Sequence, residues 1–335
     1  MPTALMVAEK PMLAQSIANI LSNGNMNSKK GFNGACSVHE YSSSFLGQPC
    51  RFKVTSTCGH VMTMDFPGKF NNWERVDPAE LFIAPTQKKE ANVKLKMPAY
   101  LASEAKGADY LILWLDCDKE GENICFEVID SVQSVMRVPH HGDLERNIFR
   151  AHFSAITDKD IKTAMNNLGK PNINESLSVD ARQELDLRIG CAFTRFQTKF
   201  FQGKYGDLDS SLISFGPCQT PTLGFCVERH DVISSFKPEP YWVMDVRLTT
   251  QQSGSEVEIR LDWSRGRIFD RDVAQLFVER VKTQSTTKVL DVTKKEGSKS
   301  RPQALNTVEL MRVASAGLGM SPATTMQIAE QLYTK

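Results

Sequence analysis

A short apolar run that ends in a cluster of acids constrains the fold more than any other part of this 335-residue chain. Residues 110–115 are continuously apolar, and Asp116, Asp118 and Glu120 follow them directly, with Gly121 in the turn. A run of this kind is typical of a parallel strand that is buried on both faces. Ligands bind at the carboxyl ends of such strands in open α/β sheets. We therefore predict an α/β fold with the three acids at the functional edge of its sheet.

The spacing of these acids suits a hard divalent cation. Carboxylates at alternate positions beside a glycine can hold Mg²⁺, or Mn²⁺, by one or two oxygens and leave the other positions to water and substrate phosphate. Taken alone, the same residues fit a solvated acidic turn equally well, because acidic turns are common. The choice between the two interpretations depends on what else lies at this edge of the sheet.

A second strand-to-helix turn favours the metal site. Residues 4–8 form a compact apolar run, which Glu9 and Lys10 follow at once. Pro11 then opens a segment with apolar residues at helical spacing, and proline is well tolerated at a helix start. Glu9 and Lys10 alone would be solvated charges. If both strands belong to one parallel sheet, however, Glu9 lies across from Asp116, and the combination of acid, lysine and carboxylate cluster indicates phosphate chemistry.

Sequence blocks along nearly the whole chain resemble the type IA topoisomerases, and the first two resemble their Toprim domain. The blocks, in the order of the family, are Val-Ala-Glu-Lys-Pro (7–11), Leu-Asp-Cys-Asp-Lys-Glu-Gly-Glu (115–122), Ser-Val-Asp-Ala-Arg-Gln-Glu-Leu-Asp (178–186), Cys-Ala-Phe-Thr-Arg (191–195), Ser-Phe-Gly-Pro-Cys-Gln-Thr-Pro-Thr-Leu (214–223) and Leu-Asn-Thr-Val-Glu-Leu (305–310). The residues in these blocks resemble those of the eukaryotic topoisomerase III beta branch more than those of the bacterial or alpha branches.

The resemblance implies four parts. Residues 1–155 would be the α/β Toprim domain, a mainly parallel sheet flanked by helices, and residues 156–231 the first part of a helix-rich nucleic-acid-binding domain. Residues 232–299 would begin a β-rich arch, and residues 300–335 would begin the helical domain that carries the nucleophile. Alternating residues at 241–248 and 257–261 predict strands in the arch, and helices are predicted over 307–314 and 322–332.

The resemblance also assigns roles at the carboxylate cluster. The family cleaves a strand by transesterification, through a 5′-phosphotyrosyl link that keeps the phosphodiester energy, so no ATP is required. By similarity, Glu9, Asp116, Asp118 and Glu120 would hold the metal. Lys10 would stabilise charge on the phosphoryl oxygens. Glu9 would also deliver a proton to the leaving oxygen, which requires a pKa raised by its acidic neighbours.

Positions that match nucleic-acid contacts of the family lie outside the cluster. His60 follows a strand-like run, and its alternative role is that of a packed histidine. Arg182 and Arg195 match positions that face single-stranded nucleic acid, and surface salt bridges explain either one equally well. The loop-like block contributes Ser214, Phe215, Gly216, Pro217, Cys218 and Gln219. Bacterial members usually carry an arginine where Pro217 stands, which removes the phosphate contact expected of that arginine.

The nucleophile of the family is a tyrosine in a Tyr-Pro-Arg context, expected just beyond the segment that matches residues 329–335. Tyr333 is not followed by Pro-Arg, so we interpret it as a packing residue. We therefore expect the chain to be cleavage-inactive alone. Two alternatives stay open: a metal-dependent fragment that only binds single strands, and another Toprim enzyme such as a nuclease that uses water.

Composition agrees with an intracellular nucleic-acid enzyme. Hydrophobic residues make up 41% of the chain, and no apolar run is long enough to span a bilayer. Eight scattered cysteines without a Cys-x-x-Cys pair indicate neither a zinc site nor a disulfide framework, which favours a reducing intracellular setting. We expect the protein in the nucleus and cytoplasm. A net charge of +1, however, is not typical of a strongly basic nucleic-acid binder, so binding to single-stranded DNA, or RNA, needs a local groove. The resemblance adds a Tudor-domain partner protein.

Overall fold

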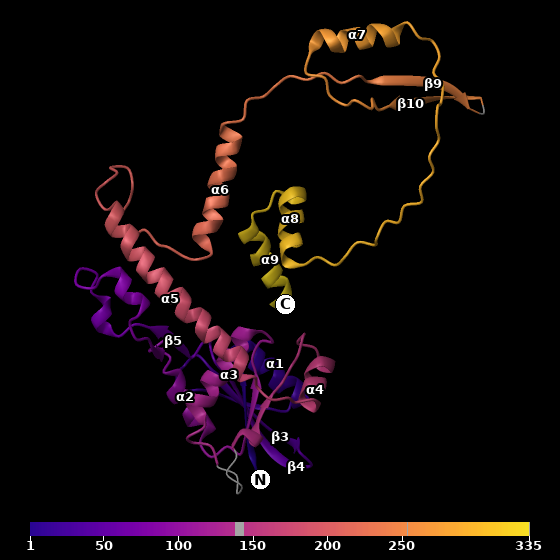
Figure 1. Ribbon diagram of the computed structural model, residues 1–335. Helices are drawn as coiled ribbons and strands as arrows, with labels where there is room; N and C mark the ends of the chain where they lie inside the picture. The colour runs from indigo at the N-terminus through magenta and orange to yellow at the C-terminus, as the bar shows by residue number, and fades with distance from the viewer. Residues whose placement is uncertain (138–143, 253, 335) are drawn as a thin grey trace. The chain divides into compact units, whose positions relative to one another are not determined.

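The computed structural model describes residues 1–137, 144–252 and 254–334. The chain divides into two compact units, residues 1–236 and 237–335, whose elements are drawn in Figure 1. The predicted domain boundaries at residues 155, 231 and 299 stay predictions. Within the described ranges, no helix is both long and apolar enough to cross a membrane.

A six-stranded, mainly parallel sheet forms the centre of the first unit. Its strands, in spatial order, are β2 (Asn27–Lys30), β3 (Ser37–Phe45), β4 (Gln48–Ser56), β1 (Thr3–Ala8), β7 (Tyr110–Trp114) and β8 (Ile148–Arg150). β1 runs parallel to both β4 and β7, and β8 runs parallel to β7. β2, β3 and β4 pair antiparallel at the other side. The two predicted strands are therefore neighbours, and the predicted fold class is confirmed.

Helices cover both faces of this sheet (Figure 1). The even-numbered residues of β1 and β7 pack against α1 (Pro11–Leu21) and α4 (Asp158–Asn166), whereas the odd-numbered ones pack against α2 (Met97–Ala105) and α3 (Lys119–Val132). Successive side chains of a strand point to opposite faces, so a strand covered on both sides must be apolar throughout. This arrangement explains the two continuous apolar runs.

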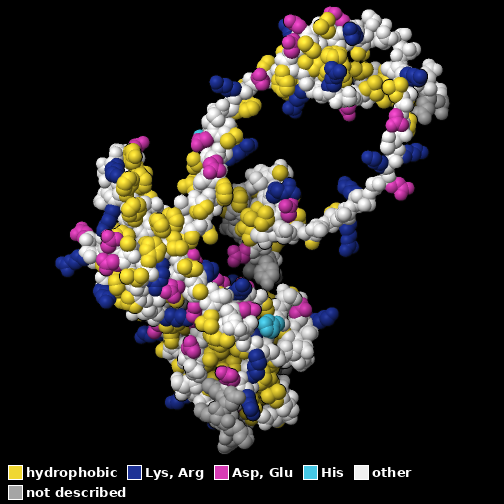
Figure 2. Space-filling model, viewed as in Figure 1, with side chains coloured by type: hydrophobic (Ala, Val, Ile, Leu, Met, Phe, Trp, Pro, Cys, Tyr) yellow, Lys and Arg dark blue, Asp and Glu magenta, His cyan; other side chains and the backbone are white. Residues whose placement is uncertain are grey.

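The rest of the first unit extends from the sheet. An insertion before β7 contains the antiparallel pair β5 (Met62–Asp65) and β6 (Gln87–Glu90) and two 3₁₀ turns, Gly68–Asn71 and Pro78–Phe82; a third turn, Leu144–Asn147, precedes β8. The insertion packs on the long helix α5 (Ile173–Phe201) through a small apolar cluster. α6 (Gln219–Ser234) has no buried residue. Phe196 and Phe200, on the second half of α5, are exposed. Figure 2 shows yellow hydrophobic side chains along this helix.

The second unit contains a β-hairpin and three described helices. β9 (Val246–Gln252) pairs antiparallel with β10 (Ser255–Leu261), and α7 (Arg271–Lys282), α8 (Thr307–Leu318) and α9 (Pro322–Thr334) follow. The two predicted C-terminal helices are confirmed. The strand predicted over 241–248 begins later, at Val246, because its hairpin partner ends at Leu261, directly opposite. Before that point only Trp242 is paired, in an isolated bridge with Ile268.

Candidate active site

The carboxyl ends of β1 and β7 lie side by side. In the parallel register Ala8 is opposite Trp114, so the residues that leave the two strands enter the same edge of the sheet. The backbone N–H of Asp116 donates to the Glu9 carboxylate, with a nitrogen-to-oxygen distance of 3.3 Å. The predicted meeting of Glu9 with the acidic run is therefore confirmed.

The turn from β7 into α3 is tight, and it fixes Asp118. Asp118 caps the N-terminus of α3, where its carboxylate accepts the Gly121 backbone N–H at 2.7 Å. This is the usual role of an aspartate at a helix start. A Cβ atom on Gly121 would lie only 2.1 Å from the carbonyl oxygen of Asp116. Glycine is therefore required, because the helix start closes directly onto the strand end.

Arg150 holds the backbone of the turn between β7 and α3, and it was not predicted from the sequence. The side chain is fully buried at the end of β8, and its guanidinium donates to the carbonyl oxygens of Leu115 at 2.8 Å and Asp116 at 2.7 Å. It also donates to the buried Glu122 carboxylate at 2.9 Å. Glu122 in turn accepts the backbone N–H of Asn172, just before α5. An arginine inside the strand-like run at residues 148–151 was the available signal.

The edge of the sheet concentrates negative charge. Burial raises the pKa of Glu9, and the neighbouring charge of Asp116 raises it further, while Lys10 acts in the opposite direction. Lys10 itself is exposed, as is Asp118. The donors at this edge are carboxylate oxygens, which suit a hard cation such as Mg²⁺. Among the described residues, however, no three His, Cys, Asp or Glu side chains converge closely enough to hold a metal ion.

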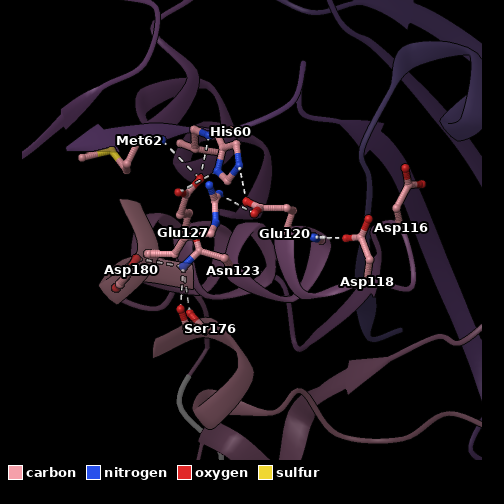
Figure 3. Close-up of polar contacts among 12 residues, drawn as sticks. His60, Met62, Asp116, Asp118, Glu120, Asn123, Glu127, Ser176 and Asp180 are labelled. Atoms are coloured by element: carbon pink, nitrogen blue, oxygen red, sulfur yellow. Dashed lines mark hydrogen bonds and ion pairs between the residues drawn. The ribbon is translucent and has the colours of Figure 1, made fainter. Parts of the chain in front are cut away.

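The carboxylates predicted to bind the metal do not converge partly because Glu120 points away from the other acids. Figure 3 shows its carboxylate directed toward His60 and away from Asp116 and Asp118. One oxygen lies 3.2 Å from Nε2 of His60, and the other accepts a hydrogen bond from Arg182 of α5 at 2.5 Å. Three residues predicted separately are therefore brought together. Arg182 also donates to Asp186 at 2.8 Å, so the alternative prediction of a salt bridge describes its contacts.

A buried glutamate on the same helix holds the other side of His60, and the sequence reasoning missed it as well. Nδ1 of His60 lies 3.2 Å from Glu127, whose second oxygen accepts the backbone N–H groups of Val61 at 2.7 Å and Met62 at 3.2 Å. The hydrogen bond to Glu127 raises the pKa of His60. A charged residue at an otherwise apolar helix position, between Phe126 and Val128, was the signal that could have indicated it.

The remaining predicted nucleic-acid contacts lie apart from this cluster. Arg195 is buried, donates to the carbonyl of Phe70 at 2.7 Å and lies over the ring of Trp73, so its guanidinium is engaged inside the unit. The block at 214–219 is a loop up to the start of α6, as predicted, and is anchored on α5 where the Phe215 N–H donates to Thr194 at 2.8 Å. Ser214, Pro217, Cys218 and Gln219 are exposed, and Gly216 is half-buried. The side chain of Tyr333 lies outside the described residues.

Comparisons with known proteins identify the family of the chain. Residues 4–156 match the family described as "Toprim domain", and residues 170–335 match the family described as "DNA topoisomerase". Over its full length the chain is 65% identical to "DNA topoisomerase 3-beta-1" of Homo sapiens, and 58% and 52% identical to "DNA topoisomerase 3-beta" of Drosophila melanogaster and of Oryza sativa subsp. japonica. It spans 37–38% of the length of these relatives. With a Toprim domain and a topoisomerase segment in this order, the chain belongs to the type IA DNA topoisomerase family.

Proposed function

We propose that this chain supplies the acid, lysine and metal-binding half of a centre that cleaves and reseals single-stranded nucleic acid without ATP. The observation that carries the proposal is the meeting of Glu9 and Asp116 at the ends of neighbouring parallel strands. The attacking tyrosine of the family is not assigned to any residue of this chain. Cleavage, strand passage and religation would be activities of a protein that contains both halves.

A divalent cation fits this edge by its chemistry. Toprim domains in general bind Mg²⁺. Glu9, Asp116 and Asp118 supply hard oxygen donors. Burial and then the charge of Asp116 raise the pKa of Glu9, and a cation would offset that negative charge. We propose these three residues as the metal-binding set, with Mn²⁺ as a substitute. Glu120 would join them only after releasing His60 and Arg182. When bound, the metal would hold a backbone phosphate and neutralise charge on it.

The remaining residues of the site act on protons and charge. Glu9 is half-buried and has a raised pKa, so it can hold a proton and give it to the leaving 3′ oxygen. Lys10 stands next to it at the start of α1, exposed, where its ammonium would stabilise charge on the phosphoryl oxygens. The charge of Lys10 acts on the pKa of Glu9, so the ammonium and the carboxylate lie near enough to act on one phosphate.

Single-stranded DNA is the proposed ligand, and RNA is a second one that rests on the resemblance to the topoisomerase III beta branch. His60 and Arg182 are the proposed phosphate contacts near the metal edge, because both are partly exposed there. The exposed loop before α6 is a further proposed contact, through its backbone N–H groups. A Tudor-domain partner and residence in the nucleus and cytoplasm stay predictions.

Incubation of the full chain with a labelled single-stranded oligonucleotide and Mg²⁺, followed by denaturation, tests this function. We expect Mg²⁺-dependent binding of the oligonucleotide, no covalent adduct and no cleavage. A covalent 5′ adduct would show that the chain contains its own nucleophile. Cleavage without an adduct would favour a nuclease that uses water. Absence of both Mg²⁺ binding and oligonucleotide binding would refute the proposal.

A further inference from the structure

We infer that Glu127 is a positioning residue: it fixes His60 and, through Glu120, Arg182, so that the imidazole and the guanidinium form a phosphate-binding side of the site, distinct from the metal-binding edge at Asp116 and Asp118. The inference rests on the proposed function, because it assumes that a nucleic-acid phosphate enters here. It assigns two roles to helix α3. Asp118, which caps the helix, would bind the metal, and Glu120 and Glu127 on the helix would hold the phosphate contacts.

Glu127 is built into the structure as an anchor. Its side chain is only 4% exposed, and both of its oxygens are used. One faces Nδ1 of His60 and the other accepts two consecutive backbone N–H groups, those of Val61 and Met62. A buried carboxylate needs such partners, because desolvation of an unpaired charge is costly. Glu127 therefore holds both the ring of His60 and the backbone that follows it, which fixes the direction of the imidazole.

Helix geometry turns this anchor into a link to Glu120. Residues seven apart lie two turns along the same helix face, so Glu120 and Glu127 point to the same side of α3. The imidazole of His60 bridges them, with 3.2 Å on each side. α3 is rigid at this point, because Ile124 and Val128 are buried in the core beneath the sheet. The side chain of Glu120 is thereby held away from Asp116 and Asp118, as Figure 3 shows.

The link continues into α5. Arg182 donates to the free oxygen of Glu120, and α3 and α5 are joined a second time by Asn123, which donates to the Ser176 carbonyl at 3.0 Å and to Asp180 at 2.9 Å. Figure 3 shows the Asn123 contacts beside the His60 cluster. The second connection joins the same two helices, so the guanidinium of Arg182 stays within reach of the Glu120 carboxylate that His60 also contacts.

Exposure increases outward along this chain of contacts. The side chain of Glu127 is 4% exposed, that of His60 31%, that of Glu120 40% and that of Arg182 55%. The buried end anchors, and the open end presents imidazole and guanidinium N–H donors, the groups that bind phosphate oxygens. A phosphate can replace the Glu120 carboxylate as the acceptor of these donors. Glu120 would then be released toward the metal-binding edge when nucleic acid binds.

Binding measurements on the full-length chain separate this role from a general structural one. We compare Glu127→Gln with Asp130→Asn, the same change of acid to amide at an exposed position of α3. Mg²⁺ affinity is measured by calorimetry, and affinity for a fluorescent single-stranded oligonucleotide by anisotropy. We expect Glu127→Gln to weaken oligonucleotide binding about tenfold, the loss of one charge-assisted hydrogen bond, with Mg²⁺ affinity unchanged. Asp130→Asn should change neither affinity.

A double-mutant cycle and a spectroscopic signal complete the test. His60→Gln should weaken oligonucleotide binding as much as Glu127→Gln, and the double variant should be no weaker than either, because the two residues act as one unit. The imidazole ¹H–¹⁵N signal of His60 should shift in Glu127→Gln and stay in place in Asp130→Asn.

Additive losses, wild-type oligonucleotide affinity in Glu127→Gln, or a parallel loss of Mg²⁺ affinity would each overturn the positioning role while leaving the proposed function intact. A His60 imidazole signal that does not shift in Glu127→Gln would also overturn the positioning role, and this measurement needs no ligand. A wild-type chain that binds neither Mg²⁺ nor oligonucleotide would instead overturn the proposed function, and the phosphate-binding role with it.

Discussion

Replacing Arg150 by methionine should destabilise the first unit severely. The Arg150 side chain is fully buried and that of Glu122 is 4% exposed, so the substitution leaves a buried carboxylate without its cation. Loss of one partner from a buried ion pair costs about 3–5 kcal/mol. The carbonyl oxygens of Leu115 and Asp116 lose donors as well, at about 1 kcal/mol each. We therefore expect a loss of about 5 kcal/mol, a large share of the total stability of a domain.

Native-state hydrogen exchange at the slowest amides of β1 and β7 measures this loss in the unit that contains the site. Exchange is preferable to a global melt here, because the chain has two compact units and one transition need not report both. Arg137→Met is the matched control. Arg137 also pairs with an acid, but its side chain is 68% exposed, and such pairs contribute at most about 1 kcal/mol.

A second variant separates the buried charge from simple loss of volume. Changing Arg150 to methionine and Glu122 to leucine together removes both charges, so part of the lost stability, about 2 kcal/mol, should return. If Arg150→Met lowers the exchange free energy by less than about 1 kcal/mol, no more than the surface control, Arg150 does not clamp the turn. If the double variant is no more stable than Arg150→Met, the unpaired Glu122 carboxylate is not the cause of the lost stability.

Three further changes probe the same edge of the sheet. Asp118→Asn should weaken Mg²⁺ binding at least about tenfold in calorimetry and leave the fold intact, because an amide oxygen can still cap α3; unchanged affinity would remove Asp118 from the site. The folded-state pKa of Glu9 lies above its reference value of 4.5. The stability that Glu9 contributes is therefore fully present below pH 4.5 and is lost as the pH rises through the folded-state pKa. Glu9→Gln should therefore raise the free energy of exchange at the slowest amides of β1 and β7 at about pH 7 without metal, and the gain should vanish near pH 4; an equal gain at both pH values would contradict a charge effect. Gly121→Ala should lower the free energy of exchange at the slowest amides of β1 and β7 by about 3 kcal/mol, because its Cβ meets the Asp116 carbonyl, and a neutral result would mean that the turn can open.

The parts of the fold that repeat a local pattern could be predicted from the sequence. β1 and β7 are buried on both faces, so they had to be continuously apolar, and that signal is visible in residues 4–8 and 110–115. Glu9 and Asp116 could be placed together because parallel strands share one edge. In the second unit, β9 started late because strand pairing depends on where the partner strand ends.

The contacts between distant segments could not be predicted in this way. Nothing local in the sequence indicates that Glu120 turns toward His60, since that contact depends on how α3 meets the segment after β4. The contact of Arg195 with Phe70 could not be predicted either. Phe70 lies in the insertion, and no periodic pattern in the sequence indicates that the insertion packs on α5. Single buried charges such as Arg150 and Glu127 were visible as residues, but their partners were not.

The parallel register of the central strands has a consequence for synthesis of the protein. β1 pairs with β7 from Ala4 opposite Tyr110 onward, and β7 pairs with β8, which ends at Arg150. Glu9 therefore leaves the ribosome long before the turn it faces, and that turn has no clamp until β8 has followed. Such non-local pairings form slowly, and until they form the apolar strands are open to aggregation. Translational pauses before residue 150 should therefore leave nascent chains dependent on chaperones, whereas pauses well after it should not.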